Sequence, residues 1–204
     1  LDLQDTPVTV AGLKVLVKLK KLTRLDLNGT QVSGTGLRDL AGLSSLTSLE
    51  LRNCPVADRG LKDVGSLKNL TSLELSGGQI TDAGLKELTA LKQLTSLVLV
   101  RTQVTDERLK HLAALQKLHF LWLAAPNVTD VGVNHLAQLK NLTTIYIYDT
   151  QMTDAGLLRL AVLECIDSLV LSGNRTTDAG IGRLKVLLPR WSISNYEVNR
   201  RPVR

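Results

Sequence analysis

The chain has few residues of the kinds that mark a cofactor site, a membrane span or a disulfide scaffold. Its 204 residues include two cysteines, one methionine and only six aromatic residues: two Trp, three Tyr and one Phe. No apolar run approaches the roughly 18 residues of a membrane-spanning helix. Phosphate-loop, metalloprotease, nucleophile-elbow and Cys-x-x-Cys patterns are also missing from the sequence. We therefore expect no membrane partner, no cofactor, no metal and no enzyme.

What the sequence does contain is a repeat of 24 residues without insertion or deletion. Each row fits L-x-x-L-x-L-x-x-(T/C/N)-x-V-x-D-x-G-L-x-x-L-x-x-L, and Thr176 is the one polar residue in the seven apolar columns. The seven rows begin at Leu22, Leu46, Leu70, Leu94, Leu118, Leu142 and Ile166. A fixed period of this length predicts a stacked array in which each repeat covers its neighbours.

Each row divides into a strand and a helix. Residues 24–28 alternate apolar and polar side chains, which predicts a short strand. In the third row, Leu85, Leu88 and Leu91 recur every three residues and form one face of a short helix. Thr81 and Asp82 before it can cap the helix N-terminus. Neither element can bury its apolar face alone, so we expect the strands to stack as a parallel sheet and the helices as a second layer.

This pattern resembles the leucine-rich repeat over the whole chain, most closely the 24-residue bacterial and the ribonuclease-inhibitor-like, cysteine-containing types. The resemblance implies an α/β fold, a right-handed solenoid or horseshoe with the sheet on the concave face and short helices on the convex face. We expect one domain over 1–204: a partial repeat at 1–21, seven repeats at 22–189, and a capping strand with a basic tail at 190–204. Trp191 is expected to cover the last core layer. No cap is visible before the first repeat, so we interpret the chain as a fragment of a longer protein.

Two columns of the repeat bear on its turns. The family places Asn or Cys in a buried ladder position, where this chain has mostly threonine, so we expect threonine hydroxyls to serve some turns. The ladder residues are Thr6, Thr30, Cys54, Gly78, Thr102, Pro126, Thr150 and Asn174. The second column lies at the starts of the expected helices and consists of glycines, except for Arg108. Because arginine would be strained at a positive φ, we expect close packing there. Its members are Gly36, Gly60, Gly84, Gly132, Gly156 and Gly180.

The outward-facing strand columns carry the binding prediction. Phe120, Trp122, Tyr146 and Tyr148, four of the six aromatic residues, fall on the expected open face of two neighbouring strands. Val98, Val100, Ala124 and Ala125 extend this apolar block. Contiguous exposed apolar area and clustered aromatics are typical of protein interfaces. The alternative is that an adjacent domain or flanking loops cover the block.

An acidic column of Asp2, Asp26, Glu50 and Glu74 precedes the aromatic block on the same face. These carboxylates could attract basic residues of a partner, or could form a solvated face that Arg24 and Arg52 partly neutralise. Calcium binding is disfavoured because rigid strands rarely supply six to eight oxygens. The predicted partner-binding residues are therefore Phe120, Trp122, Tyr146, Tyr148, Val98, Val100, Asp26, Glu50, Glu74, Arg52 and Arg101.

The expected helix side carries two further columns. His111 and His135 align, but no third metal ligand accompanies them. Lys14, Arg38, Lys62, Lys86 and Lys110 also align, and Arg190, Arg200, Arg201 and Arg204 make the tail basic. The net charge of +6 could serve a polyanion, but the aromatics lie away from the lysines, and a single-strand nucleic-acid platform needs both together. The arrangement argues against nucleic acid.

We therefore predict a non-enzymatic protein-protein interaction module that binds a protein or peptide, with basic residues in the partner, on its concave sheet. The alternatives are a structural spacer that docks on another domain of the same chain, and a polyanion binder that uses the basic helix side. The two cysteines lie in rows too distant for a disulfide, which favours an intracellular setting. The sequence does not identify the localisation or the partner.

Overall fold

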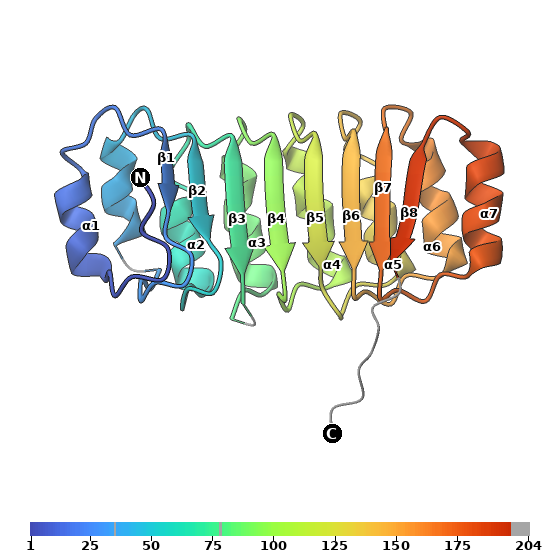
Figure 1. The fold of residues 1–204 in the computed structure, drawn as a ribbon, viewed down its shortest axis with the longest axis horizontal. Coiled ribbons are helices and arrows are strands. Elements are labelled where there is room, and N and C mark those ends of the chain that lie inside the picture. Colours follow the sequence, from blue (N-terminus) through green and yellow to red (C-terminus); the bar gives the residue numbers. More distant parts are fainter. Residues whose placement is uncertain (35, 78, 197–204) are drawn as a thin grey trace, which may run out of the picture.

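A computed structural model describes residues 1–34, 36–77 and 79–196. Eight strands form one parallel, open sheet in the order β1 to β8 (Figure 1). The strands are β1 (Arg24–Asp26), β2 (Ser48–Leu51), β3 (Ser72–Ser76), β4 (Ser96–Val100), β5 (Phe120–Ala124), β6 (Thr144–Tyr148), β7 (Ser168–Ser172) and β8 (Ser192–Tyr196). Neighbouring strands pair residues 24 positions apart, as in Trp122 with Tyr146. The predicted register and fold class are confirmed.

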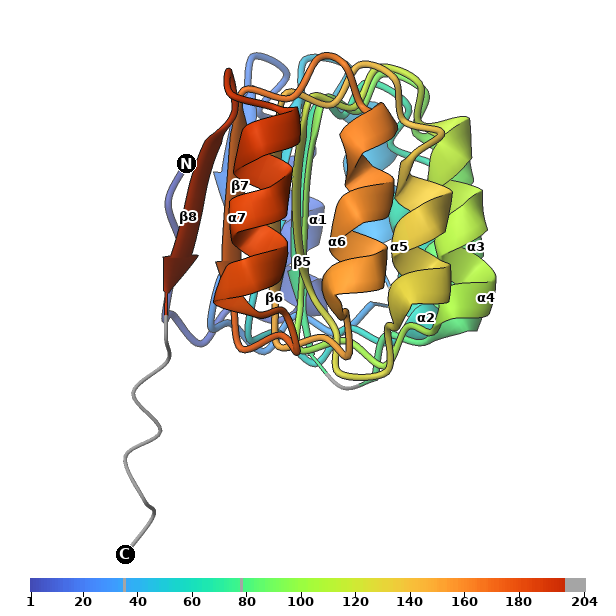
Figure 2. The same cartoon turned by 90° about the vertical axis from the view of Figure 1, so that its right-hand side faces the viewer.

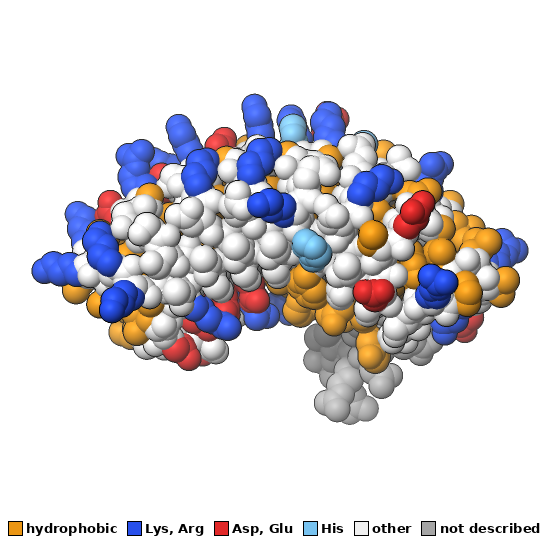
Figure 3. Space-filling model, turned by 90° about the horizontal axis from the view of Figure 1, so that it is seen from above, with side chains coloured by type: hydrophobic (Ala, Val, Ile, Leu, Met, Phe, Trp, Pro, Cys, Tyr) orange, Lys and Arg blue, Asp and Glu red, His pale blue; other side chains and the backbone are white. Residues whose placement is uncertain are grey.

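Helices form the second layer, behind the sheet in Figure 1 and on one side of it in Figure 2. The α-helices are α1 (Val10–Leu16), α2 (Asp58–Val64), α3 (Asp82–Glu87), α4 (Asp106–Leu109), α5 (Asp130–Leu136), α6 (Asp154–Arg159) and α7 (Asp178–Leu187). Short 3-10 helices are η1 (Leu37–Gly42), η2 (Leu88–Ala90), η3 (Lys110–Ala114) and η4 (Leu160–Val162). Seen from above, the molecule is an arch whose inner side is the sheet (Figure 3).

The core lies between the two layers and consists of the repeated leucines. Leu97, Leu121 and Ile145, which share one column, are fully buried, as are Leu99, Leu123 and Ile147 in the next inward column. Trp191, which the sequence predicted to cover the last core layer, is 7% exposed and belongs to the same core. The basic tail at 197–204 lies outside the described residues.

Successive repeats are also joined by a ladder of aspartate side chains at the helix starts. Asp106 accepts hydrogen bonds from the Thr129 backbone N–H (2.7 Å) and the Thr129 hydroxyl (2.6 Å) of the next repeat. Asp58, Asp82, Asp130 and Asp154 bond to the following repeat in the same way. The threonines do cap helices as predicted, since Thr81 accepts from the Ala83 N–H. The aspartates have the further role of joining neighbours, which the sequence did not reveal.

This ladder explains the glycine column. A Cβ at Gly84, Gly132, Gly156 or Gly180 would collide with the aspartate of the preceding repeat, and one at Gly60 would collide with the Gly34 backbone. Among the column's glycines, only Gly36 has a positive φ (102°). The prediction of close packing at the helix starts is confirmed, and the aspartate carboxylate is the group that needs the space.

The buried ladder position, which holds different residue types in different repeats, forms hydrogen bonds to neighbouring turns. The Thr30 hydroxyl donates to the Leu27 carbonyl (2.7 Å), and the Cys54 thiol donates to the same carbonyl (2.9 Å). Asn174 accepts from the Thr150 hydroxyl (2.7 Å) and donates to the Ile147 carbonyl (2.7 Å). Threonine hydroxyls therefore do serve some turns; Gly78 lies outside the described residues. Cys54 is buried and Cys165 exposed, and neither forms a disulfide.

Candidate partner-binding surface

Four aromatic side chains pack together on the open face of the sheet. Phe120 and Trp122 come from β5 and Tyr146 and Tyr148 from β6, and we call these four residues the concave aromatic cluster. The rings of Trp122 and Tyr148 meet edge to face, with centroids 5.6 Å apart, and those of Phe120 and Tyr146 do the same at 5.2 Å. The Tyr146 and Tyr148 rings are nearly parallel, 10° apart. Edge-to-face pairs of this kind are a favoured aromatic geometry and contribute about 0.5–1.5 kcal/mol each beyond the area they bury.

Strand alternation is what turns these rings outward. In β5, Leu121 and Leu123 are fully buried in the core. Phe120 and Trp122, which alternate with them, are half-buried on the opposite face. Tyr146 and Tyr148 are likewise half-buried. The four aromatic residues that the sequence placed on one face therefore do lie together. Because no described helix or strand covers this side of the sheet (Figure 2), the cluster is accessible in this structure.

The smaller apolar residues around the cluster are not exposed as expected. Val98 is 3% exposed, Ala124 5% and Ala125 fully buried, so the expectation that they extend an exposed block is wrong. Val98 is paired in register with Trp122, and a large ring beside a small side chain covers it. Val100, at the end of β4, is half-buried. The accessible apolar surface is thus made by the rings and Val100, and Val98 supports Trp122 from beside it.

Two polar groups of the cluster are affected by burial. The Trp122 Nε1–H is buried without a hydrogen-bond acceptor among the described residues, which costs about 1–3 kcal/mol in comparable cases. Burial raises the pKa of Tyr148 above its ordinary value, with smaller contributions from Tyr146 and Tyr196. Tyr148 is therefore a neutral hydroxyl near neutral pH and can act as a hydrogen-bond donor.

The acidic column on β1 to β3 is more buried than its outward position suggested. Asp26 is 8% and Glu50 5% exposed. Glu50 forms an ion pair with Arg24 and accepts from Asn28 Nδ2 (3.0 Å). Glu74 forms an ion pair with Arg52 at 2.6 Å. The predicted partial neutralisation by Arg24 and Arg52 is confirmed, and direct contact of Asp26 or Glu50 with a partner would require their side chains to move.

The exposed part of this charged region is mostly arginine. The side chain of Arg24 is 67% and that of Arg52 38% exposed, against 7% for Glu50. Burial raises the pKa of Glu74 above its ordinary value, Arg52 opposes this shift, and Glu50 adds to it. The carboxylates are thus already engaged with neighbouring arginines, which removes the main reason to expect basic residues in a partner.

The turns after the strands adopt a left-handed backbone that the sequence prediction missed. Arg101 (φ 55°) and Asp149 (φ 49°) follow the strands that flank β5, and Asn53 (φ 57°) follows β2. The same column contains Asp5, Gly29, Gly77 and Gly173, all with positive φ. Glycine, asparagine and aspartate favour this conformation, so their recurrence every 24 residues was a usable signal. Arg101 is the exception, and it is exposed beside the cluster.

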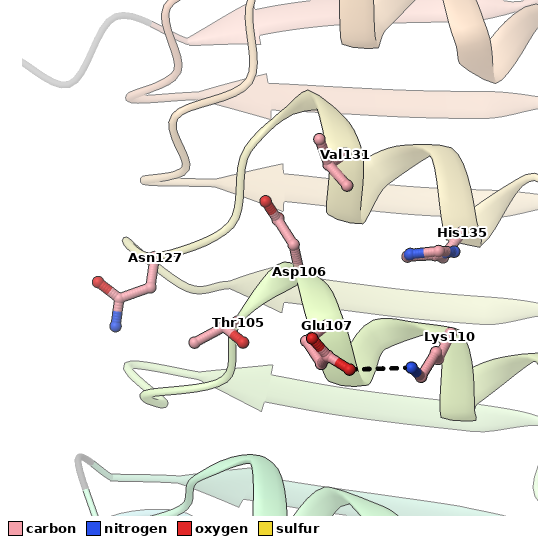
Figure 4. A pocket seen from close by; sticks show the side chains of 7 residues that line it. All are labelled: Thr105, Asp106, Glu107, Lys110, Asn127, Val131 and His135. Carbon is pink, nitrogen blue, oxygen red and sulfur yellow. Dashed lines mark hydrogen bonds and ion pairs between the residues drawn. The ribbon is translucent and has the colours of Figure 1, made fainter.

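The convex side shows one polar depression of about 420 Å³ between α4 and α5 (Figure 4). Glu107 and Lys110 form an ion pair at 3.0 Å along its α4 side, and His135 faces it from α5. Burial, followed by nearby Arg108, lowers the pKa of His111. The described residues contain no group of three His, Cys, Asp or Glu that could hold a metal. In the basic column, Arg38 pairs with Asp63 and Lys110 with Glu107, so its positive charge is interrupted.

The comparisons with known proteins agree with this geometry. A family model described as "Leucine Rich repeat" matches residues 18–41, 42–65 and 66–88. Internalin C2 of Listeria monocytogenes is similar, with a TM-score of 0.75 and 27% identity over 96% of this chain and 79% of that one. No curated protein gave a match.

Two further solved structures share the fold at lower identity. An internalin of Listeria monocytogenes has a TM-score of 0.72 and 24% identity over 95% of this chain and 52% of that one. A leucine-rich-repeat protein of Leptospira interrogans has a TM-score of 0.56 and 21% identity over 95% of this chain and 59% of that one. The chain thus spans little more than half the length of both of these proteins.

Stacked strand–helix units with one open parallel sheet define a solenoid repeat protein. Within that class, the chain is a repeat protein of the leucine-rich-repeat type. Proteins of this type are generally protein–protein interaction modules and are typically not enzymes. Within the described residues, no helix combines the length and the apolar character needed to cross a membrane.

Proposed function

We propose that this chain binds a protein partner across its concave sheet, with the concave aromatic cluster as the main contact. The observation that carries the proposal is the gathering of four of the chain's six aromatic residues on two adjacent strands. Trp and Tyr are enriched among residues that dominate interface energies, because they bury a large area at little cost in side-chain entropy.

The surroundings of the cluster fit the usual anatomy of an interface. The rings form an apolar centre, with Val100 beside them. Arg52 with Glu74 and the exposed Arg101 form a polar margin on the β2–β4 side. An apolar centre with a charged rim excludes water from the centre and selects among partners at the rim. Asp26 and Glu50 do not touch the partner in this proposal. They hold Arg24 and Asn28 in place through hydrogen bonds.

The proposal is tested by alanine substitution of Trp122 and Tyr146 together. Full-length protein is immobilised, and the proteins that it retains are compared between wild type and the double variant. Loss of two such side chains is expected to weaken binding by about 2–4 kcal/mol, and circular dichroism should show an intact array. Ser48→Ala with Ser72→Ala is the matched control, because these serines occupy the Phe120 column in the charged half.

A second variant separates the ring from its N–H group. Trp122→Phe keeps an aromatic ring and removes the buried N–H, so it should retain most of the binding. Unchanged affinity in the Trp122→Ala, Tyr146→Ala variant would exclude the cluster as the contact. If crosslinks instead join the cluster to another part of the same full-length chain, the alternative of a structural spacer would replace the proposal.

A further inference from the structure

A second apolar surface lies on the convex side of the molecule, in the helical layer. The residues Leu158, Gly182, Arg183, Val186 and Leu187 line a groove of about 460 Å³, which we call the α6–α7 groove. Helices α6 and α7 lie next to each other on the surface that faces the viewer in Figure 2. In Figure 3, hydrophobic side chains gather at the end of the arch where α7 lies.

Comparison between repeats shows that this surface departs from the pattern. The position of Leu158 and Gly182 holds Arg38, Lys62, Lys86, Lys110 and Asn134 in the earlier repeats. The position of Val162 and Val186 holds Gly42, Ser66, Ala90, Ala114 and Gln138. In the last two repeats the first of these positions loses its polar side chain, to Leu158 and then Gly182, and the second becomes valine in both.

Stacking of the repeats does not require this change. Val162 is 52% exposed although a complete repeat follows it, and its counterpart Val186 is 81% exposed. Leu187 is different, because its column is buried in the internal repeats, as at Leu163, which is 1% exposed. Leu158 and Val162 are one helical turn apart. Leu158 is half-buried against the solenoid core, and with the exposed Val162 and Val186 it forms an apolar strip that extends outward from that core.

The groove owes its depth to Gly182. A Cβ built at this residue meets no atom within 4 Å, so neither crowding nor a turn requires glycine there. Glycine inside a helix destabilises it by about 0.5–1 kcal/mol relative to alanine. Here it leaves a hollow beside Leu158 where earlier repeats carry a long side chain.

The groove is flanked by positive charge. Arg183 lines it, Arg159 and Lys185 lie on the same two helices, and Arg190 follows α7. None of these four cations forms an ion pair with a residue in the described ranges, and Arg159 Nη1 donates a hydrogen bond to Asn134 Oδ1 on α5 (3.4 Å). Among the carboxylates of this region, Asp154 is engaged by Thr177, which leaves Glu164 and Asp178 on the surface. The charge complement of this groove is therefore an acidic ligand.

We propose that the α6–α7 groove binds an amphipathic helix of a partner protein, with apolar residues in the groove and Asp or Glu on its flanks. A helix presents apolar side chains at spacings of three and four residues, which suits an apolar groove between two helices. The acidic flanks pair with Arg183, which lines the groove, and with Lys185 on the same helix. This site is separate from the concave aromatic cluster, and each can exist without the other.

The test uses two synthetic amphipathic helical peptides of about 18 residues, long enough to span a helix pair. They share the same leucine face and carry either glutamate or lysine on the polar face. Fluorescence anisotropy with the intact chain should show that the glutamate peptide binds at least about tenfold more tightly, a difference of about 1.4 kcal/mol.

Gly182→Lys is the diagnostic variant, because it restores the lysine of the earlier repeats, fills the hollow and improves helix propensity. It should weaken binding of the glutamate peptide by about tenfold or more. Ala41→Lys is the matched control: it adds the same charge at an exposed position in η1 and should change nothing. Arg183→Gln should weaken binding of the glutamate peptide and should not weaken binding of the lysine peptide, because it removes a charge that attracts the first peptide and repels the second.

Several results would overturn the proposal. Equal binding of the two peptides, no binding of the glutamate peptide, or binding that persists in Gly182→Lys would each do so. Sedimentation with phosphatidylserine vesicles that Gly182→Lys abolishes would assign the groove to a membrane surface instead. Dimerisation lost in Gly182→Lys would assign it to a second copy. Trp122→Ala with Tyr146→Ala should leave peptide binding intact, so failure here and failure of the concave site are distinguishable.

Discussion

The strands β1 to β3 and the strands β4 to β6 have the same inner face and different outer faces. In both halves the inward leucines are fully buried and stack in register. On the open face, the first half carries Arg24 with Glu50 and Arg52 with Glu74, and the second half carries aromatic rings. The fold therefore fixes the inward columns and leaves the outward columns free to change from one repeat to the next.

The two outer faces also differ in how complete they are. In the charged half, each arginine already has a carboxylate partner, so its main interactions are satisfied within the chain. In the aromatic half, the rings touch one another but remain half-buried, and further apolar area can still be removed from water. In the proposed binding mode, covering β5 and β6 would therefore remove more apolar area from water than covering β1 to β3.

The largest expected effect tests whether the inner faces of the halves are equivalent. Leu51→Ala in β2 and Leu123→Ala in β5 each remove a fully buried side chain from the same column. Each should lower the free energy of unfolding by about 2–5 kcal/mol because a cavity remains. Chemical denaturation of the two variants should give similar losses, and a loss confined to one of them would contradict the equivalence.

The next effect concerns the aspartate ladder, which runs through both halves. Asp106→Ala removes the acceptor of two hydrogen bonds from Thr129 and should destabilise the chain by about 2 kcal/mol. Asp178 occupies the same position in α7 but accepts no such bond among the described residues, so Asp178→Ala is the control. Equal effects of the two substitutions in thermal denaturation would rule out the ladder as the cause.

A smaller effect is expected in the turns, where the two halves use different residues for the same backbone. Arg101 after β4 has a left-handed φ of 55°, and Asn53 after β2 has one of 57°. Arginine pays about 1 kcal/mol for this conformation, whereas asparagine tolerates it. Arg101→Gly should therefore raise stability by up to about 1 kcal/mol, and Asn53→Gly by less. A loss of stability in Arg101→Gly would show that its side chain makes a stabilising contact.

These comparisons also show which features could be read from the sequence. The period of 24 and the alternating leucines were sufficient for the sheet, its register and the outward position of Phe120, Trp122, Tyr146 and Tyr148. The burial of Val98 and Glu50 was not predictable in this way. Alternation gives the direction of a side chain, but burial depends on whether a long neighbour such as Trp122 or Arg24 reaches across from the next strand.

The links between repeats were hidden for a related reason. Asp106 and Thr129 are far apart in the chain, and each already had an adequate local role as a capping residue. The left-handed turns could have been found, because Gly, Asn and Asp recur in their column, but Arg101 and Ala125 interrupt it. Hydrogen bonds between repeats follow from the stacking geometry, and a single row of sequence does not contain that geometry.

The smallest expected effect is a pair of opposite pH dependences. Burial raises the pKa of Glu74 above its ordinary value of 4.5, so the folded state holds this proton more tightly than the unfolded state. The contribution of Glu74 to stability is present below pH 4.5 and is lost as the pH rises through the folded pKa.

Hydrogen bonds from Thr177 lower the pKa of Asp154 below 3.8. The contribution of Asp154 to stability is therefore present above pH 3.8 and is lost as the pH falls through the folded pKa. Denaturation of wild type, Glu74→Gln and Asp154→Asn between about pH 3 and 7 measures both. As the pH rises, the free energy of unfolding of wild type should fall relative to Glu74→Gln and rise relative to Asp154→Asn. If both differences change with pH in the same direction, the charged half and the aspartate ladder do not differ in this way.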